Sequence, residues 1–101
     1  MPKYSLKTPE QVSAALAART KELRLAKGWK QVTLAQRSGV SLASLRRFEE
    51  SGRVSLESLL KLAFALNRLD DFDALLQAPR ASTMAELEAA EESPKRQRGR
   101  L

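Results

Sequence analysis

The sequence predicts an all-α protein: one compact five-helix bundle followed by a flexible C-terminal tail. Apolar residues recur at spacings of three and four, as they do on one face of a helix. Ser, Thr or Asp precedes most of these runs and glycine follows several of them, at the positions where such residues cap helices. The 101 residues suffice for a single small domain. We expect an N-terminal arm over residues 1–8, the domain over 9–78 and the tail over 79–101.

The first helix is expected over residues 9–27. Thr8 offers a capping hydroxyl, and Pro9 suits the first helical position. Lys27 and Gly28 end the helix, since a cation favours the C-terminal dipole and glycine tolerates a left-handed backbone. The residues expected on its inward face are Val12, Leu16, Thr20 and Leu23.

Trp29 follows in the turn before the second helix. A large, mostly apolar indole at this place is expected to cover the junction of the first two helices. Stacking on a nucleic-acid base is the alternative.

The second and third helices, over residues 31–38 and 42–50, are separated by a short turn. Gly39 ends the second helix and Ser41 caps the third. Ala35 is small enough to let the two helices approach closely. A turn of three or four residues containing glycine joins two helices in this way in DNA-binding motifs.

The fourth helix is expected over residues 56–67, after a cap at Ser55. Leu62 and Phe64 flank its main apolar stripe, so the apolar arc is wider than one partner helix requires. The stripe itself consists of Leu56, Leu59, Leu60, Ala63 and Leu66.

A short fifth helix is expected to begin at Asp70 or Asp71 and to close before Pro79. Its apolar residues, at helical spacing, are Phe72, Leu75 and Leu76. Beyond it, Thr83 and Glu86 form a possible capping box that opens an acidic segment ending near Glu92. This segment and the basic "SPKRQRGRL" after it contain too few apolar residues for a core, so we expect a frayed helix or disorder.

The composition favours binding over catalysis. The chain has neither cysteine nor histidine, which removes disulfides, thiolate metal sites, the commonest zinc ligands and the commonest general base. We therefore expect no enzymatic activity, no metal and no cofactor. The longest apolar run, "LESLLKLAFAL", is too short to cross a bilayer, and no apolar signal core precedes it. The expected location is the cytoplasm, with no membrane contact.

The charge distribution indicates an anionic partner. The net charge is +6, but residues 1–69 are strongly basic, residues 70–92 are acidic, and residues 93–101 are basic again. A basic folded segment is typical of proteins that attract phosphate, although lysines also serve simply to solvate helices.

The segment 42–50 has two distinct faces when it is drawn as a helix. Leu45 and Phe48 point to one side and anchor it to the core. Leu42 lies on the border. The opposite side carries Ala43, Arg46, Arg47 and Glu50. Such a basic face fits the DNA major groove, which is about 12 Å wide and admits one helix.

These features resemble the Cro-like, or Xre-type, helix-turn-helix family over residues 12–76. The residues at the family's spacing are Gln31, Ala35, Gly39, Val40, Leu45 and Phe48. The resemblance implies a lambda-repressor-like five-helix domain, double-stranded operator DNA as partner, and a repressor that acts as a homodimer.

The resemblance also implies roles for single residues. Base edges would be read by Leu42, Ala43, Ser44, Arg46 and Arg47, and Gln31 would contact a phosphate or an end base. Arg24 and Glu49 occupy positions that form an ion pair in relatives, and we expect a partly buried bidentate pair that holds the third helix. From their places in turns and at helix ends, we expect further phosphate contacts from Lys27, Lys30, Arg37 and Arg53.

The sequence is compatible with several protein partners. The surplus apolar residues expected at a dimer contact are Leu62, Phe64, Phe72, Leu75 and Leu76, although they could equally pack the fourth helix on the fifth. "SLKTPEQV", "SLRRFEESG" and "LNRLDDFDALL" resemble the HipB-like antitoxins, which would imply autoregulation of an operon and a HipA-like kinase toxin as partner. The alternatives are an ordinary transcriptional regulator, and a protein-interaction module with little DNA readout. The basic tail could add DNA affinity, bind an acidic protein, or be a solvated end.

Overall fold

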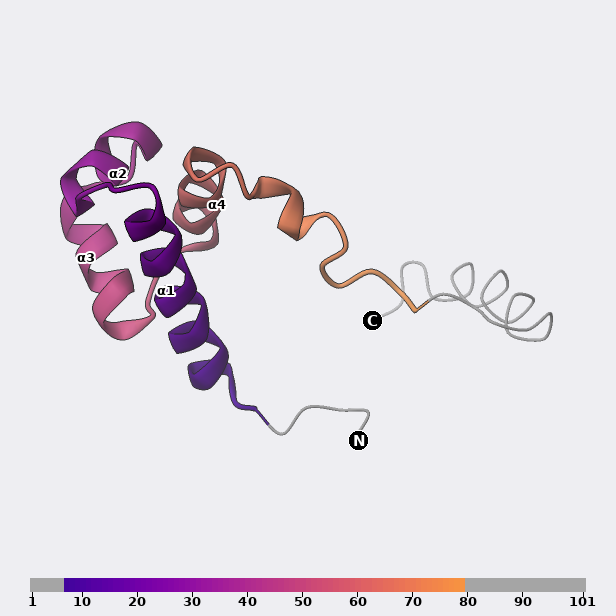
Figure 1. The fold of residues 1–101 in the computed structure, drawn as a ribbon. Coiled ribbons are helices and arrows are strands. Elements are labelled where there is room, and N and C mark those ends of the chain that lie inside the picture. The colour runs from indigo at the N-terminus through magenta and orange to yellow at the C-terminus, as the bar shows by residue number, and fades with distance from the viewer. Residues whose placement is uncertain (1–6, 80–101) are drawn as a thin grey trace, which may run out of the picture.

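The computed structural model describes residues 7–79, which form four α-helices and one short 3-10 helix (Figure 1). The helices are α1 (Pro9–Ala26), α2 (Gln31–Ser38), α3 (Leu42–Ser51) and α4 (Leu56–Ala65), and the 3-10 helix spans Leu69–Phe72. The described residues contain no strand, so the all-α prediction is confirmed. The predicted N-terminal arm and C-terminal tail fall mainly on residues 1–6 and 80–101, which lie outside the described part.

Side-chain caps start the helices where the sequence predicted. Thr8 and Gln11 form a reciprocal capping box at the start of α1. Ser41 and Ser55 each accept a hydrogen bond from the backbone N–H three residues later. Gly39 and Gly52 end α2 and α3 with φ of 79° and 80°, a left-handed conformation that glycine adopts with little strain.

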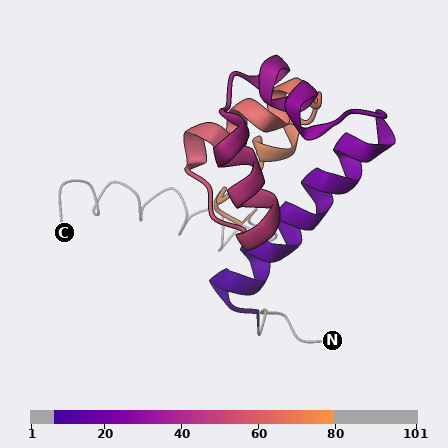
Figure 2. The same ribbon diagram turned by 90° about the vertical axis from the view of Figure 1, so that its left-hand side faces the viewer.

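One core joins the four helices. Helix α1 packs beside α3, and α2 lies at one end of this pair, where it contacts both α3 and α4 (Figures 1 and 2). The buried apolar residues are Ala17, Leu34, Ala35, Val40, Leu45, Phe48, Leu62, Ala63 and Leu66. Burial of the two anchors of α3 among them fixes which side of that helix remains outside.

The inward face of α1 differs from the predicted one at its beginning. Ala17, Thr20 and Arg24 are buried, whereas Val12 is 43% exposed. The backbone of Ser13, not that of Val12, faces Gly52 at the end of α3. Because successive helical residues differ by about 100°, a stripe through Ser13 turns Val12 away from the core. The prediction for Val12 is wrong.

Helix α4 is shorter and turned relative to the prediction. It ends at Ala65 because Asn67 adopts a positive φ of 63°, and the N–H groups of Asn67 and Arg68 bond back to the carbonyls of Phe64 and Ala63. This pattern is a Schellman motif, which terminates a helix. Leu62 is only 1% exposed, so it belongs to the core and not to a flank. Leu56, expected inside, is exposed because it lies at the start of the helix on the outer side.

The predicted fifth α-helix is wrong. The chain forms a single 3-10 turn over Leu69–Phe72 and then irregular turns, with a positive φ at Leu76. Leu76 is 96% exposed, and Leu75 is exposed as well. So short a helix depends on packing for its stability, and no described element covers these two leucines.

Candidate nucleic-acid interface

Helix α3 presents the basic outer face that its sequence predicted. Leu45 and Phe48 are completely buried against the other helices. Leu42 is half-buried, and the exposed residues of the helix are Ala43, Ser44, Arg46, Arg47, Glu50 and Ser51. The two core anchors therefore hold both arginines in solvent, available to a ligand.

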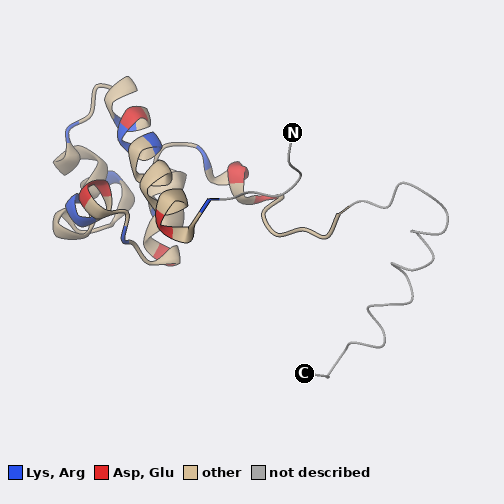
Figure 3. Cartoon of the chain, turned by 90° about the horizontal axis from the view of Figure 1, so that it is seen from below, with Lys and Arg blue, Asp and Glu red and all other residues tan. Residues whose placement is uncertain are grey.

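Basic residues lie in the turns beside this face, and acidic residues lie both on the helices and in the segment after α4 (Figure 3). Lys30, at the start of α2, and Arg53, just after α3, are exposed in the turns beside α3. The 3-10 helix and the turn that follows it carry Asp70, Asp71 and Asp73. These three aspartates therefore lie beyond α4, apart from the basic face of α3.

A buried ion pair fixes α3 to α1. Arg24 donates from Nε to Oε2 of Glu49 at 2.8 Å and from Nη2 to Oε1 at 3.0 Å. The two side chains are only 7% and 4% exposed. A third donor of the same guanidinium, Nη1, bonds the carbonyl of Trp29 at 2.8 Å. The expected bidentate pair is thus present, and it also fastens the turn between α1 and α2.

Gln31 extends this pair toward the outer face, which the sequence did not reveal. Its Nε2 donates to Oε1 of Glu49 at 2.9 Å, and its Oε1 accepts from Nε of Arg46 at 3.4 Å. The family resemblance implies that Gln31 contacts a phosphate or an end base. That contact stays a prediction, because the amide nitrogen carries two hydrogens and Glu49 takes one. Gln31 and Glu49 are 18 positions apart in the sequence, and no local pattern indicates that they meet.

Trp29 combines core packing with two cation–π contacts. Its ring is half-buried against the core, as expected for a residue that covers the junction of α1 and α2. Nζ of Lys27 lies 5.3 Å and Cζ of Arg37 lies 4.6 Å from the ring centroid. Two of the expected phosphate-binding cations are therefore gathered over one ring.

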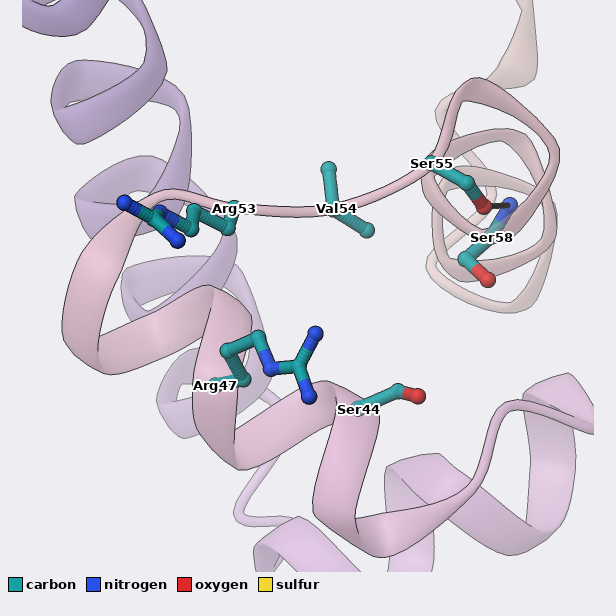
Figure 4. A pocket seen from close by; sticks show the side chains of 6 residues that line it. All are labelled: Ser44, Arg47, Arg53, Val54, Ser55 and Ser58. Carbon is teal, nitrogen blue, oxygen red and sulfur yellow. Dashed lines mark hydrogen bonds between the residues drawn. The ribbon is translucent and has the colours of Figure 1, made fainter.

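A small cavity opens between α3 and the start of α4 (Figure 4). It has a volume of about 220 Å³ and is lined by Ser44, Arg47, Arg53, Val54, Ser55 and Ser58. The guanidinium of Arg47 points into the space between α3 and the following loop, whereas the side chain of Arg53 runs back over the end of α3. The cavity thus combines one inward cation with three serine side chains.

The residues expected at a dimer contact do not all lie on the surface. Leu62 is occupied by the core of its own chain, so its assignment to the contact is wrong. Phe72 is half-buried. Phe64 is 72% exposed, and Leu75 and Leu76 are exposed beyond it. Three of the five residues are therefore free to meet another molecule.

Within residues 7–79 no group of three or more Asp or Glu side chains is placed to hold a metal ion. No helix in this part of the chain is long and apolar enough to span a membrane.

Comparison with known proteins agrees with this geometry. A family model described as helix-turn-helix matches residues 21–72, just over half of the chain. The matched range runs from the second half of α1 to the end of the 3-10 helix. No curated protein and no solved structure gives a significant match.

Proposed function

Because the chain belongs to the Cro-like, or Xre-type, helix-turn-helix family of DNA-binding transcription regulators, we propose that it is a sequence-specific repressor of its own operon. The observation that carries this proposal is the outer face of α3, where Arg46 and Arg47 are exposed while Leu45 and Phe48 hold the helix to the core. A basic helix anchored in this way suits insertion into a major groove.

In the proposed complex α3 lies in the major groove with its first turn toward the bases. Leu42 and Ala43 offer only apolar contact, for example to a thymine methyl, and Ser44 adds one hydroxyl. Hydrogen-bonded readout therefore depends on arginine. A bidentate arginine–guanine pair contributes about 1–3 kcal/mol of discrimination.

Phosphates are proposed to occupy the margins of α3. On one side lie Lys27, Lys30 and Arg37 around the start and end of α2. On the other side lies the cavity between α3 and α4, where Arg47 points toward the loop before α4 and Ser55 and Ser58 contribute the start of α4 to the lining. A helix N-terminus next to a guanidinium favours an anion, so this cavity fits a phosphate of the groove wall. Arg53 is exposed beside it and adds positive potential.

The repressor is proposed to act as a homodimer. One such motif reads few base pairs, and two copies read half-sites about 34 Å apart. The exposed side chains of Phe64, Leu75 and Leu76 provide apolar area for a two-fold contact. On α4, Glu57 and Lys61 pair with each other at 3.5 Å on the same side of the helix as Phe64, in the turns that precede it.

We further propose that the protein is an antitoxin that binds a toxin protein. It is supported by the three sequence segments that resemble HipB-like antitoxins, which imply a HipA-like kinase as the bound protein. A gene for a kinase-like protein next to this one would support the antitoxin role. Its absence would leave an ordinary transcriptional regulator.

The test is footprinting on the DNA upstream of the protein's own gene, over a range of salt concentrations. We expect a protected region with two half-sites, and loss of protection in Arg47→Glu. Arg19→Glu makes the same charge change on the exposed side of α1, opposite the buried residues of that helix, and should leave the footprint intact. Protection that is absent at every salt concentration, while the protein is folded, would contradict the proposal in favour of a protein-interaction module.

A further inference from the structure

We propose that Gln31 is a positioning residue that directs Arg46 toward the bases, and that the buried Glu49 in turn orients Gln31. This inference deepens the proposed DNA-binding function, and it gives Gln31 a role beyond the expected contact with a phosphate or an end base. It rests on a continuous chain of hydrogen bonds from α1, through α3 and α2, to the outer face of α3.

The carboxylate of Glu49 decides which way the amide of Gln31 points. Oε1 of Glu49 accepts hydrogen bonds from Arg24 and from Nε2 of Gln31. Turning the amide over would place its oxygen against the carboxylate oxygen, and neither atom is a donor. The amide oxygen must therefore face away from the core, where Nε of Arg46 donates to it.

The backbone around Gln31 makes this orientation reliable. Gln31 is the first residue of α2, and the next turn of that helix buries Leu34 and Ala35 in the core. Glu49 is itself held by two hydrogen bonds from a nearly buried guanidinium. Both ends of the Gln31 side chain are thus attached to parts of the fold that have little freedom.

The contact leaves the useful end of Arg46 free. Gln31 takes only the Nε–H, so both terminal nitrogens keep their hydrogens. Those two nitrogens form the fork that meets O6 and N7 of a guanine. Since the side chain is already held in one direction, less rotamer freedom is lost when it binds.

Arg47 provides a matched internal control, because it follows Arg46 but has a different environment. The two side chains are about 100° apart around α3, and the Arg47 guanidinium points toward the loop before α4. Within residues 7–79 no side chain hydrogen-bonds the Arg47 guanidinium, and Ser51 bonds only the backbone carbonyl of Arg47. Gln31 should consequently influence Arg46 alone.

A double-mutant cycle in the full chain tests the inference. Gln31→Met keeps the length of the side chain and removes both polar atoms, and it is combined with Arg46→Ala or with Arg47→Ala. On the preferred operator we expect Arg46→Ala to weaken binding roughly 5- to 150-fold in the wild type, the range of one bidentate base contact, and much less when Gln31 is already Met. The loss caused by Arg47→Ala should be the same in both backgrounds.

Two results would overturn the inference. One is equal weakening by Gln31→Met on operator and on mixed-sequence DNA with effects additive to Arg46→Ala, which is the behaviour of a simple phosphate contact. The other comes from NMR of the free wild-type protein. The inference predicts slower hydrogen exchange at Nε of Arg46 than at Nε of Arg47. Equal exchange rates at the two Nε atoms would show that Gln31 does not hold Arg46, whatever the variants do.

The NMR measurement separates this inference from the proposed function. If the wild-type chain binds no operator while Nε of Arg46 is protected, the repressor proposal fails and the positioning network stands. If operator binding is normal and the protection is absent, the repressor proposal stands and the inference fails.

Discussion

The two edges of α3 treat neighbouring arginines differently. On the α2 edge, Arg46 meets Gln31, which is bonded to the buried Glu49. On the α4 edge, Arg47 points into an open cavity lined by serines. The two residues have the same chemistry and are adjacent in the sequence, so the difference arises entirely from what the fold places beside them. A restrained side chain favours geometric selectivity, and an unrestrained one adapts to whichever anion is near.

The two arginines differ because the two edges of α3 offer different hydrogen-bond acceptors. The α2 edge contains a buried carboxylate and an amide, and within residues 7–79 every buried side-chain nitrogen and oxygen has a hydrogen-bond partner. The α4 edge contains hydroxyls that are partly used for capping, such as Ser55 on the N–H of Ser58. No carboxylate lines the cavity, so the guanidinium that points into it lacks a strong internal partner there and is available to a phosphate.

The largest effect is expected from removing the buried carboxylate at the α2 edge. Glu49→Ala leaves the guanidinium of Arg24 buried and unpaired, which should lower the free energy of unfolding by about 3–5 kcal/mol. Urea denaturation followed by circular dichroism measures this loss. Replacing both residues by leucine should cost less than Glu49→Ala alone. A double variant as unstable as the sum of the single variants would show that the two charges are not coupled.

A second effect tests the turn that forms the α4 edge. Gly52→Ala adds a Cβ about 3.1 Å from the backbone of Ser13, whereas Gly39→Ala meets nothing within 4 Å. Both variants carry the left-handed strain of roughly 1–2 kcal/mol. Gly52→Ala should be less stable by a further ~1–3 kcal/mol, because α3 must move away from α1. Equal melting curves would mean that this end of α3 is not tightly packed on α1.

The third effect concerns the ligands of the two edges. If Arg47 holds a phosphate in the α4-edge cavity, Arg47→Ala should weaken binding to all sequences and reduce the salt slope by about one. Arg46→Ala should instead relax the preference at one base position and leave most of the slope unchanged. Binding titrations at several salt concentrations on operator and mixed DNA distinguish them. A change of base preference in Arg47→Ala would return this residue to the base-reading role that the family resemblance implied.

The smallest effect is expected away from both edges. Glu57 and Lys61 on α4 form an exposed pair at 3.5 Å. Glu57→Gln should change the free energy of unfolding by only about 0.3–0.5 kcal/mol, since solvent and salt screen such a pair. The same urea measurement therefore compares a surface ion pair directly with the buried one. A loss approaching that of Glu49→Ala would contradict the role assigned to burial.

Much of the fold was predictable because it is encoded locally. The caps at Thr8, Ser41 and Ser55 and the glycine after α2 depend on residues within one helical turn, and all are observed. The outward face of α3 followed from the spacing of two anchors. The fifth helix failed because its stability required packing that no local pattern reports.

The candidate site was predictable in its residues but not in its connections. Family spacing pointed to Arg24 with Glu49, and to the arginines of α3. The bond from Gln31 to Arg46 and the cavity beside Arg47 bring together side chains from different helices. Their positions depend on how α2 and α4 pack on α3, which is a property of the whole core.

By itself, the sequence determined where the helices begin, where glycine stops them and which side of α3 carries charge, because these depend on neighbours along the chain. Only the tertiary structure decided that Leu62 lies inside, that Val12 lies outside and that one arginine is held while the next is free. These outcomes depend on the rotation of each helix about its own axis. That rotation is set by close packing and by one buried ion pair, both of which join residues far apart in the chain.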